Sequence, residues 1–598
     1  MRRKLGWTMV VAIAALGLTM CAKKEERRTI PSVPAPKPAH QAGTSTKPAP
    51  RTPAADPAKA ALDDARKLVA QYTKAYAALE HASNLAWWRA YATGDKAAYA
   101  EKQKLELDIR KLQSDRKVFA RIKALRSVGL IKDSILNRQL YLMELAFEEN
   151  QIAPALLKRL VDESTQVEKI FNEFRGTIGG KQVSRNDIED ILVKSRSSRR
   201  RKAAWIAAKQ VGPKVAPLLV KLIKHRNEAA HKLGFKNYYA MQLKINEQDP
   251  AEIKAIFDEL DKLTAAPFKK AKARLDHFLA RRYHVKVSAL RPWHYEDPFF
   301  QEVPKLATVD MDRYFKKVDS LAMAKKFYKG LGFDVDTILA HSSLYPQKGK
   351  SQHAFCTDID RSGDVRVLVN LQKNQKWAST LLHELGHGVY FEYIDRKLPF
   401  LLRQPAHIFT TEGIAMMFER VVNNPKWLVA MGIITARTAS RLAKKLREAR
   451  VLRGLVFARW SLVMVNFERR LYENPDQDIN KLWWDLVEQY QLVHRPDGRN
   501  MPDWATKTHI AEAPAYYHNY MLGELYNSQL MDYLAKHVAA TKVADPTMLT
   551  FLNMPEVGKY LKDKVFAPGA EWSWQEFVRR TTGAPLSSKA FAAQYVMP

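Results

Sequence analysis

The chain has 598 residues, and its 97 Lys and Arg against 63 Asp and Glu give a formal net charge of +34. This length allows a core large enough to need no disulfides, and only two cysteines, Cys21 and Cys356, are present, so a small disulfide-based scaffold is excluded. The positive charge favours anionic partners: nucleic acid, anionic lipid, cell-wall polymers, or peptides with free carboxylates.

Residues 1–21 have the pattern of an export signal. Arg2-Arg3-Lys4 precedes an apolar run from Leu5 to Met20, which is too short to span a bilayer comfortably. The run ends at Leu18-Thr19-Met20-Cys21, which resembles a bacterial lipobox with Cys21 as the lipidated first residue. We therefore predict an exported lipoprotein anchored in a membrane, facing the periplasm or lying at the outer membrane or cell surface. An ordinary secreted signal and an uncleaved anchor are the alternatives.

Residues 22–60 are rich in Pro, Ala, Lys and Thr and lack apolar periodicity. Such a segment cannot bury enough surface to offset the entropy lost on ordering. We predict a disordered tether over 22–60 and one large folded domain over 61–598.

The densest basic run extends from Lys194 to Lys202 and contains Arg196, Arg199, Arg200 and Arg201. No recognised nucleic-acid module accompanies it, and an exported protein seldom meets nucleic acid. We interpret the run as a solvated helix face and predict no nucleic-acid partner.

A β-hairpin is predicted near the middle of the chain. Val365, Val367, Val369 and Leu371 alternate with Arg366 and Asn370, which indicates a strand with one apolar face. A second short strand, from about His353 to Ile359, is joined to it through residues 360–364, where Asp, Ser and Gly favour a turn. We expect Cys356 in this hairpin to pack as a small apolar residue.

The segment after the hairpin is predicted to be a helix, because apolar residues recur from Trp377 onward at three- and four-residue spacing. It contains His383-Glu384-Leu385-Gly386-His387, in which two histidines four residues apart share one face and can bind one metal ion. Glu384 is a carboxylate that can take a proton from water and pass it on. The motif predicts a zinc-dependent hydrolase.

A hydrolytic zinc site usually takes three protein ligands and leaves one position open. We predict Glu412 as the third ligand, because it opens a new apolar-periodic segment after a span that allows a loop and a returning helix. The alternative is a first-turn glutamate favoured by the helix dipole. Glu419, two turns further on, is predicted to orient a ligand histidine, with a solvated residue as the alternative.

These residues resemble the angiotensin-converting enzyme (peptidyl-dipeptidase A, M2) family. The likeness is carried by His353-Ala354, the HELGH motif, Leu402-Arg403, Glu412, Lys507-Thr508-His509-Ile510 and Tyr517-His518-Asn519-Tyr520. Upstream, residues 225–239 resemble a helix and turn that this family shares with thimet oligopeptidase and carboxypeptidase Taq. The likeness covers most of the chain after residue 60 and is close around the metal motif.

The resemblance implies a mainly α fold: a large helical ellipsoid with a deep central cleft and a small β-hairpin beside the HExxH helix. The abundance of Ala, Leu, Lys, Arg and Glu and the scarcity of Gly agree with a helical fold. By the same resemblance His383, His387 and Glu412 bind one Zn²⁺ per chain. Glu384 is then the general base, and later the acid that protonates the leaving amine.

Other family positions imply how a peptide is held. His509 and Tyr520 match donors that stabilise the charged oxygen of the transition state. His353 and Ala354 match the strand that pairs with an extended peptide. Lys507 and Tyr517 match groups that hold the C-terminal carboxylate, which would place the second peptide bond from the end at the metal and release dipeptides.

The chain also departs from the family pattern. Tyr295 stands where the family has a glutamine in the carboxylate pocket, which weakens the dipeptide prediction. Val487 and Asn519 stand where the family has chloride-binding arginines, so we do not expect strong chloride activation. Met416 replaces a family aspartate near the glutamate ligand, and Glu419 is its predicted substitute.

We therefore predict a zinc metallopeptidase that acts on short peptides with a free C-terminus and releases dipeptides. A monocarboxypeptidase and an oligoendopeptidase of a related helical family are alternatives. So is a non-catalytic basic lipoprotein that binds envelope material, although such a protein would have no need of an intact Glu384. The physiological peptide and the oligomeric state are not predicted.

Overall fold

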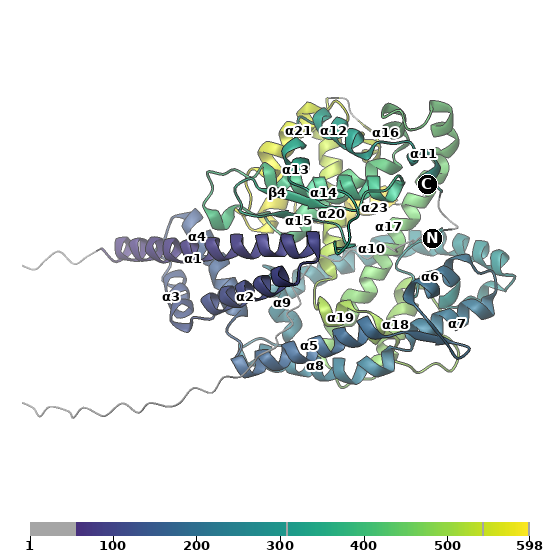
Figure 1. The fold of residues 1–598 in the computed structure, drawn as a ribbon, viewed down its shortest axis with the longest axis horizontal. Helices are drawn as coiled ribbons and strands as arrows, with labels where there is room; N and C mark the ends of the chain where they lie inside the picture. The colour runs from purple at the N-terminus through teal and green to yellow at the C-terminus, as the bar shows by residue number, and fades with distance from the viewer. Residues whose placement is uncertain (1–55, 306–308, 541–542, 596–598) are drawn as a thin grey trace, which may run out of the picture.

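The computed structural model describes residues 56–305, 309–540 and 543–595. The described chain is almost wholly helical and contains two antiparallel two-stranded sheets (Figure 1). The predicted mainly α class is confirmed. The predicted signal segment with Cys21, and the predicted tether as far as residue 55, lie outside the described residues.

Four N-terminal helices extend together to one side of the molecule (Figure 1). They are α1 (Pro57–Thr93), α2 (Lys96–Gln113), α3 (Arg116–Ser127) and α4 (Ser134–Glu149). Each begins after an aspartate whose carboxylate accepts a hydrogen bond from the first turn, which stabilises a helix start. Because Asp56-Pro57 is such a start, the folded region begins four residues before the predicted boundary at 61. The four helices share a small apolar core of their own, which Leu401 joins from the rest of the chain.

The next segment is built of long helices and one small sheet. Its elements are α5 (Pro154–Glu173), β1 (Gly176–Ile178), β2 (Lys181–Val183), α6 (Arg185–Lys194), α7 (Ser198–Lys209), α8 (Gly212–Lys232), α9 (Tyr238–Ile245) and α10 (Pro250–Tyr283). The basic run falls largely on α7, and the prediction of a solvated face is wrong for Arg201. Its side chain is fully buried, donates to the Trp293 carbonyl at 2.8 Å and lies over the Tyr283 ring. Buried arginine of this kind is structural and contributes nothing to a basic surface.

The predicted hairpin is confirmed and leads into the motif helix. Strand β3 (Phe355–Asp358) pairs with β4 (Val365–Leu368), and Phe355 lies opposite Leu368. The helices around it are α11 (Asp312–Phe315), α12 (Ser320–Gly330), α13 (Asp336–Ala340), α14 (Gln375–Glu392), α15 (Ile408–Glu419) and α16 (Pro425–Ala430). Both strands contact α14, so the hairpin lies beside the motif helix as predicted.

The C-terminal part is wrapped around one very long helix, α17 (Ala436–Glu473). It continues through α18 (Ile479–Leu486), α19 (His509–Glu512), α20 (His518–Tyr533), α21 (Pro555–Tyr560), α22 (Trp574–Thr582) and α23 (Lys589–Tyr595). Short 3-10 and π-helical segments lie between the helices: η1 (Val287–Ala289), η2 (Pro292–His294), η4 (Phe400–Leu402), η5 (Arg420–Asn423), η6 (Val487–Gln491), η7 (Asp503–Thr506), η8 (Leu534–Val538), η9 (Pro546–Met548) and η10 (Leu561–Phe566). One continuous apolar core joins most of the elements from α5 onward.

Helix α15 packs against both α14 and α20 near the centre of this core (Figure 1). Glycines allow the close approach. A Cβ atom at Gly386 would lie 2.9 Å from the Ala415 Cα, and one at Gly413 would lie 2.8 Å from the Tyr526 ring. Larger residues there would push α14 and α20 away from α15. In the described part of the chain, no helix is both long enough and apolar enough to cross a membrane.

Candidate metal centre

The two motif histidines are held on one side of α14. The helix begins after Asn374, whose side-chain oxygen accepts from the Trp377 N–H at 2.9 Å, and its apolar face is buried in the main core. His383 and His387 follow one turn apart, as a 3.6-residue period requires, with ring centroids 5.0 Å apart. Both rings are largely buried.

Glu412 reaches these histidines from α15. That helix begins after His407, whose ring Nδ1 accepts from the Phe409 N–H at 3.3 Å. The Glu412 Oε2 atom lies 3.6 Å from His383 Nε2 and 3.8 Å from His387 Nε2. One ligand atom from each of the three residues falls within 4.8 Å of the others. The structure thus brings together the three residues predicted as metal ligands.

A divalent metal fits this cluster. Zinc with ligand distances of about 2.1 Å holds tetrahedral ligand atoms about 3.4 Å apart, close to the separations found. The Glu412 Oε2 atom is buried and accepts no hydrogen bond, which would be costly for a carboxylate oxygen without a cation. Two imidazoles and one carboxylate are also a donor set that suits Zn²⁺.

Each histidine is oriented through its other ring nitrogen. His383 Nδ1 lies 3.0 Å from Glu419 Oε2, and His387 Nδ1 lies 2.8 Å from Thr411 Oγ1. Such contacts fix which ring nitrogen faces the metal. Glu419 therefore stands where it was predicted to act. Thr411 was missed, because a threonine beside a ligand carries no distinctive sequence signal.

The buried carboxylates and histidines of the cluster change one another's pKa values. Burial lowers the pKa of His383, but Glu419, Glu384 and Glu412 raise it overall to about 9. Burial and the neighbouring His383 lower the pKa of His387 well below its ordinary value. Burial raises the pKa of Glu384 to about 7, against the lowering effect of His383. A carboxyl with a pKa near neutrality is suited to both accept and return a proton.

Aromatic and histidine side chains from α19, from α20 and from the segment between them lie close together. His509 is buried, its Nδ1 has no hydrogen-bond partner among the described residues, and its ring centroid lies 6.4 Å from that of Tyr520. The Tyr516 ring meets the Tyr520 ring edge to face, with centroids 5.3 Å apart, and its buried hydroxyl has no described partner either. Burial and the nearby Glu412 raise the pKa of Tyr516 well above its ordinary value. Tyr516 was missed as a candidate donor, because three tyrosines lie close together in the sequence.

Comparison with known proteins decides the family. The model of the M2 peptidases, described as angiotensin-converting enzyme, matches residues 59–284 and 296–598. The chain belongs to the angiotensin-converting enzyme family. The matching model is that of a peptidase family, so the chain has a peptidase fold, and it carries three residues that could hold a metal ion.

Individual relatives are distant. The chain is 22% identical to angiotensin-converting enzyme of Oryctolagus cuniculus over 449 residues, 69% of this chain and 33% of that protein. It is 21% identical to the enzyme of Theromyzon tessulatum over 442 residues, 68% of this chain and 70% of that protein. An inactive angiotensin-converting enzyme-related protein of Caenorhabditis elegans is 23% identical over 355 residues, 52% of this chain and 39% of that protein. The match thus spans a third of the length of the Oryctolagus cuniculus protein.

Lys507 and Tyr517, the predicted carboxylate-binding residues, lie beside a glutamine that the sequence did not indicate. Lys507 donates to Gln301 Oε1 at 2.6 Å and lies over the Tyr517 ring, whose hydroxyl accepts from Trp460. The Tyr295 hydroxyl accepts from Lys272 and donates to Asp276 on α10. The structure thus places Gln301, and not the Tyr295 hydroxyl, against Lys507.

The register differs because the backbone between Tyr295 and Gln301 is irregular. Glu296 and Phe300 both adopt positive φ angles, of 68° and 51°. Residue-for-residue alignment through such a turn cannot predict which side chain reaches Lys507. Burial lowers the pKa of Lys507 to about 8.

The remaining family positions are placed as follows. His353 is exposed and Ala354 half-buried, both just before β3, whose strand contacts α14. Val487 is buried, and Asn519 accepts from Gln248 at 2.7 Å. Cys356 is a free thiol packed between the hairpin and α14, 3.8 Å from where a Cβ of Gly388 would lie.

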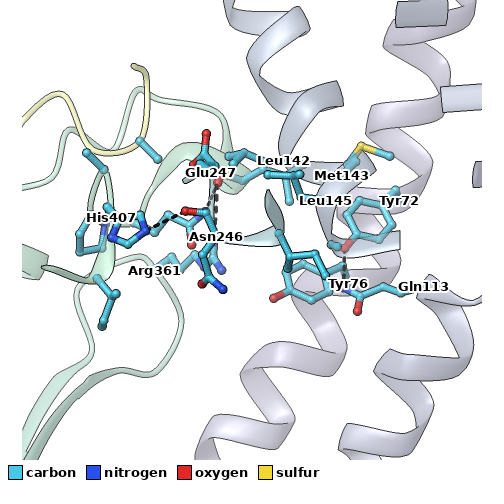
Figure 2. A pocket seen from close by; sticks show the side chains of 18 residues that line it. Tyr72, Tyr76, Gln113, Leu142, Met143, Leu145, Asn246, Glu247, Arg361 and His407 are labelled. Carbon is cyan, nitrogen blue, oxygen red and sulfur yellow. Dashed lines mark hydrogen bonds between the residues drawn. The ribbon is translucent and has the colours of Figure 1, made fainter. Parts of the chain in front are cut away.

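A cavity of about 310 Å³ lies at the start of α15 but does not contain the metal cluster. Figure 2 shows His407, Asn246, Glu247 and Arg361 on one side and Tyr72 and Gln113 on the other. His407 Nε2 lies 2.9 Å from the Asn246 carbonyl oxygen. The cavity separates α1 and α4 from the N-terminal end of α15, and we do not assign the peptide site to it.

Proposed function

We propose that this family member is a zinc-dependent metallopeptidase that removes dipeptides from the free C-terminus of short peptides. One observation carries the proposal. His383, His387 and Glu412 converge in a buried cluster with an unpartnered Glu412 oxygen, and Glu384 lies on the same helix as the histidines. A protein that only bound envelope material would need none of these groups.

Zinc held by these three residues would supply Lewis-acid charge to the scissile carbonyl and lower the pKa of water. Glu384 takes the proton from the attacking water and returns it to the leaving amine, a task that suits its raised pKa. His509, whose pKa burial holds well below its ordinary value, acts as a neutral donor to the developing oxyanion. Tyr520 donates to the same oxygen, and Tyr516 is a further donor that faces the site.

Which peptide bond is cut depends on how the C-terminal end of the substrate is held. In this proposal Lys507, held by Gln301 and stacked on Tyr517, pairs with the C-terminal carboxylate of the peptide. Ala354 and His353, just before β3, pair with the extended peptide backbone. With the carboxylate fixed in this way, the second bond from the end meets the metal.

We also propose that the protein is exported and anchored by a lipid on Cys21. The basis is the apolar segment that ends at Leu18-Thr19-Met20-Cys21. Metabolic labelling with a radioactive fatty acid tests this proposal, since a Cys21→Ser variant is expected to lose the label and leave the membrane fraction.

The peptidase test uses the chain from Asp56 onward with zinc and a ten-residue peptide whose C-terminus is free. Mass spectrometry is expected to show successive losses of two residues, and an otherwise identical peptide with a C-terminal amide is expected to be cut far more slowly. Single-residue losses would instead indicate a monocarboxypeptidase, and internal fragments an oligoendopeptidase. If zinc is bound and no peptide is cut, the chain resembles the inactive relative, and the proposal fails.

A further inference from the structure

A second cavity, of about 590 Å³, lies away from the metal cluster, against the first half of α17. Its walls come from α17, from the segment Arg420–Pro425 that follows α15, and from η9. Met531 of α20 and Tyr595 of α23 also contribute to the lining. This volume is typical of cavities that hold small molecules.

The lining is strongly biased toward positive charge. Five basic side chains line the cavity, against the two acidic side chains Glu448 and Asp545. The basic residues are Arg274, Arg420, Lys444, Arg447 and Arg450. Asp545 is already engaged by Arg450, and Arg420 pairs with Glu524.

Two of these cations have no partner of their own. Lys444 and Arg447, one turn apart on α17, are exposed at the rim of the cavity and form no hydrogen bond or ion pair with any residue that the structure describes. Deeper in the wall the Arg450 Nε atom is buried without an acceptor. The excess of cationic donors over the two carboxylates of the wall favours an anion that accepts from them.

Part of the lining is apolar. Leu446, Val451 and Met531 are buried core residues that reach the same space, and the half-buried Met548 joins them. A bare inorganic anion would leave this surface uncovered, whereas an apolar group attached to the anion would cover it.

We propose that this cavity binds a small organic anion, a carboxylate or phosphate group on an apolar body, and that Lys444 and Arg447 recognise its charge. The cavity is connected to both metal-binding helices. Arg420 directly follows Glu419, the carboxylate beside His383. Asn423, also in the wall, accepts from the Gln375 side chain at 3.1 Å, and Gln375 is the first residue of α14.

The test is calorimetric titration of the metal-free chain, kept in chelator so that binding at the metal cluster is absent. The probes are phenyl phosphate, inorganic phosphate and phenol at fixed ionic strength. Phenyl phosphate is expected to bind at one site per chain, about tenfold or more tighter than inorganic phosphate, with no detectable binding of phenol. Equal binding of the two phosphates would overturn the proposed apolar part of the site.

The matched variants lie on the same helix. Lys444→Gln with Arg447→Gln is expected to weaken phenyl phosphate binding at least about tenfold. Arg441→Gln with Lys445→Gln removes the same charge from exposed positions that do not line the cavity and is expected to leave binding unchanged. If both double variants lost the same affinity for phenyl phosphate, the effect would come from overall charge, and the proposed site would be refuted.

Turnover with zinc restored is a second readout, and it alone rests on the proposed peptidase function. Saturating phenyl phosphate is expected to change the turnover of the parent chain, and to change it less when Lys444 and Arg447 are replaced. Calorimetry remains decisive for binding even if no peptide is cut.

Discussion

At the scale of single residues, the metal cluster depends on side chains that contact the Nδ1 atoms of the two histidines. Glu419 and Thr411 come from α15, the helix that also supplies Glu412, so one helix contributes a ligand and both orienting contacts. From the resemblance to the family, an aspartate was expected at the position of Met416. Here Glu419, one turn further on, contacts His383 with a longer side chain.

Glu384→Gln is expected to keep the metal and lose peptide hydrolysis by about 100-fold or more. The amide has nearly the same shape but cannot accept the proton from water. Metal content measured by atomic spectrometry, together with turnover of a free peptide, checks this expectation. Undiminished turnover with zinc bound would rule out the assigned base.

Glu419→Gln is expected to weaken zinc affinity by about 10 to 100 fold, because the contact that fixes the His383 ring loses its charge. Competition with a chromogenic chelator measures the affinity. The matched control is Glu392→Gln. Glu392 is the last residue of α14 and is not part of the cluster, so this variant is expected to leave the zinc affinity unchanged. A loss as large in the control would contradict the positioning role.

Much of this residue-level picture could be predicted from local spacing, since His383, Glu384 and His387 share one helix. Glu412 and Glu419 likewise follow from helical periodicity on α15. Gln301 could not be predicted, because positive φ angles before it break the register. The burial of Arg201 could not be predicted either, since it depends on Trp293 and Tyr283 from distant segments.

At the scale of elements, the site depends on how closely α14 and α15 approach. Gly386 lies between the two motif histidines on the face that meets Ala415. The helix and the hairpin were predictable from periods of 3.6 and 2 residues. The contact between α14 and α15 was implied by the predicted ligand Glu412, but the close packing at Gly386 was not predicted, because it depends on the path of the irregular loop between the two helices.

Gly386→Ala is expected to destabilise the fold by about 1 to 3 kcal/mol, because its Cβ would overlap the Ala415 backbone. Gly388→Ala, one half-turn away, would meet only the movable side chains of Ile338 and Cys356 at 3.3 and 3.8 Å. Its cost is offset by the better helix propensity of alanine, about 1 kcal/mol. Urea denaturation of both variants checks the contrast, and equal stabilities would contradict the packing argument.

At the scale of the whole molecule, the predicted metal ligands join two successive helices, α14 and α15, across the loop between them. Metal bound by the folded chain and absent from the unfolded chain stabilises the fold by mass action, about 2.7 kcal/mol at 100 times the dissociation constant. Adding a chelator is therefore expected to lower Tm, and restoring zinc to raise it again. His383→Ala is expected to abolish this difference, and scanning calorimetry measures it.

Stability is also expected to depend on pH through Glu468 of α17. Burial raises the pKa of this carboxyl to about 7, although the Ala515 N–H and Arg226 act in the opposite direction. In the unfolded chain its pKa is about 4.3, so the folded state holds the proton more tightly. The contribution of Glu468 to stability therefore falls as pH rises between about 4.3 and about 7, by at most about 1.4 kcal/mol per pH unit.

Glu468→Gln is expected to remove this loss, so that the variant gains stability over the parent chain between pH 5 and pH 8. Urea denaturation at the two pH values measures the difference. A difference that does not change with pH would contradict the assignment of this slope to Glu468.

The rate at which a thiol reagent labels Cys356 reports on local opening of the fold. In the chain from Asp56 onward Cys356 is the single thiol, and it is half-buried on β3, facing α14. Burial holds the pKa of this thiol well above its ordinary value, so a thiol reagent is expected to react slowly and to react faster when the hairpin separates from α14. Zinc bound at the proposed site would join α14 to α15, and it is expected to slow labelling only if that opening also disturbs the cluster.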